Sequence, residues 1–253
     1  MTTNEYRPDR FALQFALAQK IAAVAPMPLS QALFAYTQVW YWIKIGAPHS
    51  NQNPVWVRYM AGLIESDDPQ AWTAAFCRER EGADVLDPAA KNPRFGCFSY
   101  SHWSRRLIRI HFSPQQPMPE GILDRAHMAD RLAELKALFS HVKSHMPKAR
   151  RVRGGSWLYN VEAYRRLFPP KYIETAKVVR GDWQYMALWG QFYDRCGRVK
   201  EEMAAPFLAC VEQQRTLERV LDCFPYQVLQ PDSAIQHFYD FYQIDRTSHC
   251  KHR

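Results

Sequence analysis

Apolar residues recur at helical spacings in the first part of the chain. They predict one helix over residues 11–24 and a second over 30–45, with Ser30 as the N-cap of the second. Because the second helix is apolar on most of its faces, we expect it to lie at the centre of a helical bundle.

Two further helices follow the same pattern. One is predicted over about 55–64, and the next begins after Asp68, a suitable N-cap, with Pro69 in its first turn, where a missing N–H costs nothing. A polar segment with two prolines, "EGADVLDPAAKNP", comes next. This change in composition places a boundary near residue 90.

Beyond the boundary the apolar pattern alternates. Strands are predicted over 94–100 and 106–112, and the five residues between them predict a hairpin. In the second strand alternation puts three apolar residues on one face and Arg109 and His111 on the other. A long amphipathic helix is predicted over 122–145.

The remaining elements are shorter. Asn160 is expected to cap a helix over 161–168. A last helix is expected to begin at Asp232 or Ser233. Strands are predicted over 152–158, 172–179, 186–194 and 226–230, and a helix over 200–217. The predicted fold is α+β: an N-terminal helical bundle over 1–90, followed by an α/β part over 91–253 with a small mixed sheet.

Composition narrows the class of protein. Hydrophobic residues make up 47% of the 253 residues, as in a globular protein. No apolar run approaches the roughly 20 residues of a membrane helix, and the N-terminus lacks the apolar stretch of a signal peptide. We therefore expect a cytoplasmic protein with no membrane partner. The six cysteines include no CxxC pair, so reduced thiols are expected.

The formal net charge of +8 makes an acidic partner plausible, and the basic residues are densest between Lys148 and Arg166. Guanidinium groups match phosphate or carboxylate oxygens, and glycines let backbone N–H groups approach an anion. This segment predicts either an anion-binding loop or a solvated basic turn. The candidate ligand-binding residues are Arg151, Arg153, Gly154, Gly155, Ser156, Trp157 and Arg165, with Trp157 beside a planar ligand such as adenine.

A family resemblance rests on the same segment. "RVRGGS", residues 151–156, resembles the pyrophosphate loop of acetyl-CoA-dependent N-acyltransferases. The order "IRIHF", long helix, "GGSWLYN" is similar to the C-terminal part of bacterial two-domain N-acyltransferases. The run "GGSWLYN…YRRLFPP…WGQF" also resembles bacterial proteins with no assigned activity. The resemblance implies an acyltransferase-like fold with acyl-CoA as cofactor, its pyrophosphate held by residues 151 and 153–156.

His111 is the candidate catalytic residue, since an imidazole on a polar strand face can act as general base for an amine acceptor. The alternative is a histidine that only satisfies a neighbouring backbone group. His141 and His145 stand four residues apart in "HVKSH", but the zincin pattern requires Glu where Val142 stands, so no metal is predicted.

Two other functions fit the same sequence. The basic surface suits a non-enzymatic binding module for nucleic acid or an acidic protein, an alternative that we do not favour over a small anionic ligand. The apolar helix over 33–45 suits docking of a protein partner, and the sequence does not determine the oligomeric state. The favoured expectation is an acyl-CoA-dependent N-acyltransferase, or an inactive relative that binds an anionic cofactor.

Overall fold

The computed structural model describes residues 8–46, 49–83, 92–113, 121–179, 184–185, 187–194 and 196–244. The chain divides into two compact units. The first comprises Met1–Ala90 and Arg180–Pro225, and the second comprises Lys91–Val179 and Tyr226–Arg253. The sequence indicated a single boundary near residue 90 and did not anticipate that the chain returns to the first unit for a further segment.

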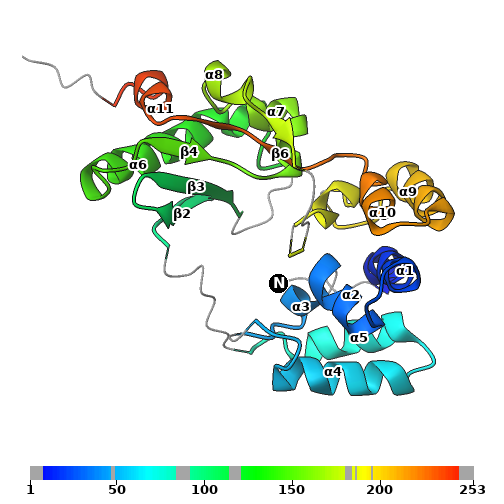
Figure 1. Cartoon of the computed structure of the whole chain (residues 1–253). Coiled ribbons are helices and arrows are strands. Elements are labelled where there is room, and N and C mark those ends of the chain that lie inside the picture. Colours follow the sequence, from blue (N-terminus) through cyan, green and yellow to red (C-terminus); the bar gives the residue numbers. More distant parts are fainter. Residues whose placement is uncertain are drawn as a thin grey trace, which may run out of the picture. The chain divides into compact units, whose positions relative to one another are not determined.

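The first unit is helical (Figure 1). Helix α1 packs against α2, α5, α9 and α10, so helices from both segments of the unit share one core. The described helices are α1 (Pro8–Val24), α2 (Leu29–Tyr36), α3 (Val39–Trp42), α4 (Pro54–Glu65), α5 (Pro69–Glu79), the 3-10 helix η4 (Trp189–Phe192), α9 (Glu201–Gln213) and α10 (Leu217–Asp222).

The predicted cap of α5 is confirmed. The carboxylate of Asp68 accepts hydrogen bonds from the backbone N–H groups of Gln70 and Ala71. The predicted cap of the second helix is wrong, because α2 begins at Leu29, with Pro28 at the N-cap position and no side-chain cap.

The predicted helix over 30–45 is also divided in two. Thr37 has extended backbone between α2 and α3. Its hydroxyl donates to the Leu33 carbonyl and accepts from the Val39 N–H at 3.2 Å. A threonine side chain that bonds to nearby main chain competes with the helical hydrogen bonds. The apolar spacing continues across the break, which is why the sequence pattern did not reveal it.

Two further predictions in this unit are corrected. The expected strand over 186–194 contains the 3-10 helix η4, whose Trp189 and Phe192 are fully buried against Phe207 and Phe224. A short apolar run does not distinguish a strand from a buried helical turn.

The expectation of reduced thiols fails for Cys210 and Cys223, which form a disulfide with Cα atoms 5.7 Å apart. Cys250 lies outside the described residues.

The second unit contains a mixed five-stranded sheet, which confirms the predicted α+β class (Figure 1). Strands β3 and β4 are parallel, and the other neighbouring pairs are antiparallel. In spatial order the strands are β1 (Arg94–Phe95), β2 (Phe98–Ser104), β3 (Leu107–Phe112), β4 (Arg151–Arg153) and β7 (Asp232–Ala234). A two-stranded sheet pairs β5 (Lys177–Val178) with β6 (Leu229–Gln230).

Helix α6 (Met128–His145) packs on one face of the five-stranded sheet. Its Leu135 and Phe139 share a buried core with Ile108, Ile110 and Val152 of β3 and β4. Parallel neighbouring strands need a crossover connection between them, and α6 forms the connection from β3 to β4. The remaining helices of this unit are the 3-10 helices η2 (Arg125–His127) and η3 (Trp157–Asn160), and α7 (Glu162–Arg165), α8 (Pro170–Ile173) and α11 (Gln236–Phe241).

Several predicted elements of this unit have different bounds. β2 extends to Ser104, so the hairpin turn is shorter than the five residues expected. The predicted strand over 172–179 is divided between α8 and β5. Val161, not Asn160, is the N-cap of α7, and the Asn160 amide donates to the carbonyls of Trp157 and Gln227.

Two more elements have bounds that differ from the prediction, and both contain or adjoin predicted ligand-binding residues. The predicted strand over 152–158 ends at Arg153, and η3 follows from Trp157. The last helix begins at Gln236, not at Asp232 or Ser233, because residues 232–234 form the edge strand β7. Within the described ranges, no helix has the length and apolar character needed to cross a membrane.

Candidate functional site

The face of the sheet opposite the α6 core carries polar side chains. Alternation along β3 buries Ile108 and Ile110 in the core and turns Arg109 and His111 to the other face. The strand register pairs Arg109 with Ser101 of β2 and with Arg153 of β4. Asp232 of β7 pairs with Arg153, so four adjacent strands contribute to one polar surface. We call Ser101, Arg109, His111, Arg153 and Asp232 the polar face.

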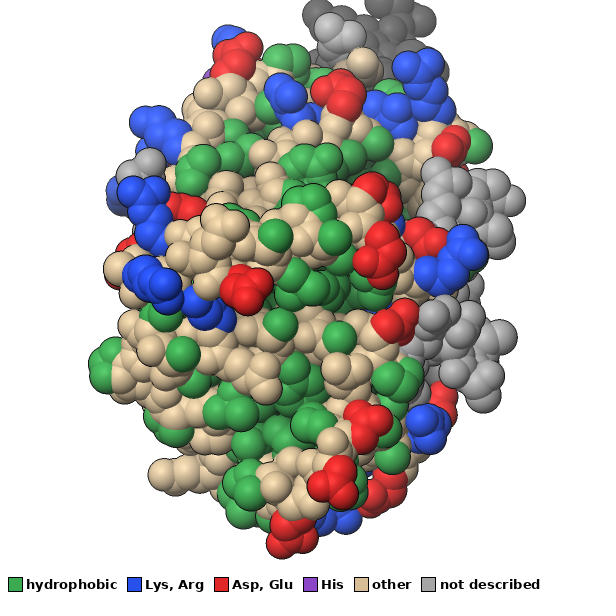
Figure 2. All heavy atoms as spheres, turned by 90° about the vertical axis from the view of Figure 1, so that its right-hand side faces the viewer, with side chains coloured by type: hydrophobic (Ala, Val, Ile, Leu, Met, Phe, Trp, Pro, Cys, Tyr) green, Lys and Arg blue, Asp and Glu red, His purple; other side chains and the backbone are tan. Residues whose placement is uncertain are grey.

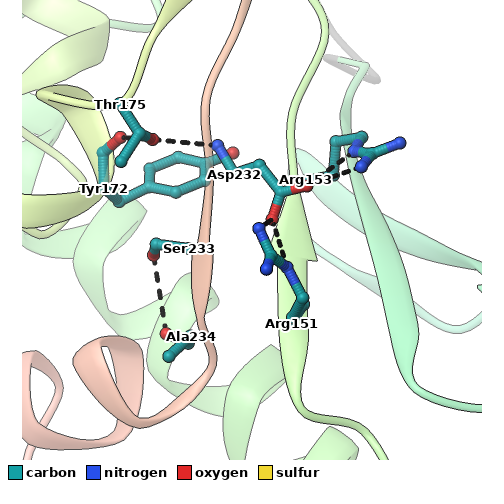
Figure 3. Close-up of polar contacts among 7 residues, drawn as sticks. All are labelled: Arg151, Arg153, Tyr172, Thr175, Asp232, Ser233 and Ala234. Carbon is teal, nitrogen blue, oxygen red and sulfur yellow. Dashed lines mark hydrogen bonds and ion pairs between the residues drawn. The ribbon is translucent and has the colours of Figure 1, made fainter.

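Arg151 and Arg153 both bind the carboxylate of Asp232 (Figure 3). Arg151 contacts Oδ1 through Nε at 2.8 Å and Nη2 at 2.7 Å. Arg153 contacts Oδ2 through Nε at 2.8 Å and Nη2 at 2.7 Å. The backbone N–H of Asp232 donates to Thr175 Oγ1 at 3.0 Å. The two arginines expected to bind a ligand therefore share an internal carboxylate.

Arg109 differs from these arginines. Its side chain is half-buried, and no acidic side chain among the described residues forms an ion pair with it. Its guanidinium lies 5.5 Å from the ring centroid of Trp103. Burial lowers the pKa of Arg109, and the nearby charge of Arg153 acts in the same direction. A partly desolvated cation without a carboxylate partner is stabilised by a bound anion.

His111, the predicted catalytic residue, forms a hydrogen bond with Ser101. The distance between His111 Nε2 and Ser101 Oγ is 2.7 Å. Burial lowers the pKa of His111, and the charge of Arg109 lowers it further, so the neutral imidazole is favoured at neutral pH. When Nε2 is unprotonated the Ser101 hydroxyl donates to it, which is the geometry of a general base beside a hydroxyl.

The two glycines have different neighbours. A Cβ at Gly154 would collide with the hydroxyls of Tyr159 and Tyr172, which are themselves hydrogen-bonded at 2.9 Å. A Cβ at Gly155 would lie 2.8 Å from Nη2 of Arg109. Gly154 therefore permits tight packing of the core, whereas Gly155 leaves room for the Arg109 guanidinium.

We expect the Gly154→Ala substitution to lower the free energy of unfolding by about 2 kcal/mol, because both tyrosines are buried and cannot move freely. Chemical denaturation of the full chain measures this change. Gly82→Ala is the matched control, since a Cβ there meets no atom within 4 Å. The control should change stability by less than about 0.5 kcal/mol. Equal effects of the two substitutions would contradict the packing role of Gly154.

The other predicted ligand-binding residues have local contacts. Ser156 Oγ accepts from the Leu158 N–H at 3.1 Å and so caps η3. The Trp157 ring stacks on Tyr226 at 6.0 Å. Arg165 lies on α7, with Nη1 3.9 Å from the Glu162 carboxylate. Trp157 does not share a strand face with Arg151 and Arg153, because the strand ends before it.

Sequence reasoning missed three members of the polar face. Arg109 was placed on the face of His111 but not in the site, although strand alternation was a sufficient signal for it. Ser101 was assigned to the hairpin turn, and Asp232 to the start of a helix. For Asp232 the sequence has no clear signal, because β7 pairs with a strand about eighty residues earlier in the chain.

Comparison with family models, with curated proteins and with solved structures found no match. Figure 2 shows one face of the molecule, on which acidic and basic side chains are interspersed among the described residues.

Proposed function

We propose that the polar face of the second unit binds a small anionic ligand and that Arg109 is its principal contact. The observation that supports this proposal best is the half-buried Arg109 guanidinium, which has no acidic partner within the described residues. Gly155 leaves space beside it. Phosphate and carboxylate groups both match a guanidinium through paired hydrogen bonds.

His111 supplies the chemistry in this proposal. Its neutral imidazole is hydrogen-bonded to Ser101 and lies near enough to Arg109 for that charge to lower its pKa. A base in this position removes a proton from an incoming amine or hydroxyl while Arg109 stabilises negative charge on the other substrate. The reaction class we propose is acyl transfer from acyl-CoA in the cytoplasm, the activity that the resemblance of residues 151–156 implies.

The proposed position of the anion differs from the one expected from the sequence. Arg151 and Arg153 are held by Asp232, and Ser156 caps a helix of four residues. These contacts occupy the groups that a pyrophosphate would otherwise need. We therefore place the anion at Arg109 and assign residues 151–153 the role of holding β4 against β7.

Calorimetric titration with CoA, acetyl-CoA and inorganic pyrophosphate tests the proposal. An interaction between a guanidinium and an anion contributes roughly 1.5–3 kcal/mol, so Arg109→Gln should weaken binding about tenfold to a hundredfold. Arg58→Gln is the control, because Arg58 is exposed in the first unit and paired with Glu79 at 2.7 Å. Unchanged affinity in Arg109→Gln, or no binding of any of the three compounds, would refute the anion site.

A second variant separates the position of Arg109 from its charge. Gly155→Ala keeps every charge but displaces the end of a flexible side chain, so it should weaken binding with little loss of stability. His111→Ala should retain the affinity for CoA and abolish acetyl transfer to an amine. Full transfer activity in this variant would remove His111 from the mechanism.

A nucleic-acid surface is the second candidate. Trp103 is 60% exposed and lies over Arg109, close in sequence to Arg105 and Arg106 at the hairpin turn. An exposed aromatic ring among arginines is suited to stacking with unpaired bases. Binding to a single-stranded oligonucleotide would then weaken steeply with salt, with a slope of about 0.7 per phosphate neutralised, whereas CoA binding at one arginine would have a shallow salt dependence.

A further inference from the structure

A pair of histidines on α6 lies outside the polar face. His141 and His145 are four residues apart on the helix, and their rings stack with centroids 3.9 Å apart and planes at 11°. His145 is exposed and His141 is half-buried. Two nitrogens bound to one metal ion at roughly 2.0–2.1 Å are about 3 Å apart. The two rings are close enough to reach this separation, but they are nearly parallel, so both side chains must rotate before their nitrogen lone pairs converge on one ion.

The hydrogen bonds of both rings leave the same nitrogen available. His145 Nδ1 lies 3.0 Å from the His141 carbonyl oxygen. Since a carbonyl oxygen only accepts, Nδ1 carries the proton and the lone pair of His145 is on Nε2. His141 Nδ1 lies 3.1 Å from the Tyr100 hydroxyl. When this Nδ1 donates to the hydroxyl oxygen, the lone pair of His141 is on Nε2 as well.

This arrangement matches a common feature of metal-binding histidines. Such a histidine usually donates its other ring N–H to a carbonyl or another oxygen, which fixes the tautomer and orients the ring. The zincin pattern is not needed, because a two-imidazole site requires only the spacing of four residues on a helix.

We propose that His141 and His145 bind a divalent transition-metal ion of the imidazole-preferring class, such as Zn²⁺ or Cu²⁺, through both Nε2 atoms. Within the described part of the chain, no group of three or more metal-ligating side chains is present, so water completes the coordination. The site is independent of the anion proposed at Arg109. Imidazole ligands suit both ions, and the order of divalent affinities favours Cu²⁺ over Zn²⁺.

The experiment uses the full chain without an affinity tag. The sequence also contains His249, Cys250 and His252, whose side chains bind the same metals. All measurements are therefore made in a background with His249→Ala, Cys250→Ser and His252→Ala. Calorimetric titration with ZnCl₂ and with CuSO₄ at pH 7.5 gives the affinities, and the paramagnetic resonance spectrum of Cu²⁺ reports nitrogen ligands.

In this background we expect one ion per chain. The double variant His141→Ala, His145→Ala should lose binding, and Tyr100→Phe should weaken it about tenfold by removing the partner of His141 Nδ1. His49→Ala, which replaces a histidine packed against Trp40 in the first unit, should bind as the background protein does. Equal binding by the double variant, no binding by the background protein, or a Cu²⁺ spectrum without nitrogen ligands would overturn the proposal.

Discussion

Replacing Phe139 by alanine should lower the free energy of unfolding by about 4 kcal/mol. Phe139 lies at the centre of α6 and is fully buried. Its ring stacks on Phe238 with centroids 4.5 Å apart and on Tyr242 at 5.4 Å. Truncation removes these contacts and leaves a cavity between α6 and α11. Since small proteins are stable by roughly 5–15 kcal/mol, this substitution removes a large part of the total.

Urea denaturation of the full chain gives the overall change, and amide hydrogen exchange in β2, β3 and α6 assigns it to the second unit. Phe241→Ala is the matched control, because Phe241 lies on α11 but is 39% exposed. This control should cost less than about 1 kcal/mol. If Phe139→Ala costs no more than the control, Phe139 does not pack in the core of the second unit.

Asp232→Ala should destabilise the second unit by about 3 kcal/mol, the next largest effect. The carboxylate is only 16% exposed and neutralises part of the charge of two arginines. The Arg151 contact is largely exposed and contributes less than about 1 kcal/mol. The half-buried Arg153 contact contributes about 2 kcal/mol, because removing one partner of such a pair leaves the other charge uncompensated.

Denaturation measures this loss, and Glu162→Ala is the control from the same unit. Glu162 is 80% exposed, and its contact with Arg165 spans 3.9 Å, so stability should hardly change. The conservative Asp232→Asn variant adds a functional measurement. It weakens the hold on two guanidinium groups, of which that of Arg153 is next to Arg109, and should therefore raise the affinity for pyrophosphate. A fall in that affinity, with the fold intact, would show that Asp232 supports the ligand site.

Local signals were sufficient where one element determines its own structure. Asp68 and Pro69 predicted the start of α5, because a capping carboxylate and a proline act on the adjacent turn. The apolar stripe of α6 and the alternation along β3 also predicted which faces are buried. Local signals failed at η4 and at the break after α2, where burial and a threonine hydroxyl decided the conformation.

Local alternation along β3 predicted one part of the site. It placed His111 on a polar strand face, and the structure has Arg109 on the same face. The rest of the site depends on strand pairings that no local pattern specifies. The ion pairs of Arg151 and Arg153 with Asp232 depend on β7, which arrives from the far end of the sequence. A strand of three residues has too few positions to show a period, so a basic loop and a basic strand inside a sheet have the same sequence pattern.

The division of both units into separated segments has a consequence for synthesis. Helix α1 packs against α9 and α10, and β4 pairs with β7, so each unit needs residues beyond position 200. At a synthesis rate of roughly 5–20 residues per second, the N-terminal helices leave the ribosome on the order of ten seconds before the segments that they pack against. During that interval their apolar faces are uncovered, and nascent chains of this protein should be good chaperone clients.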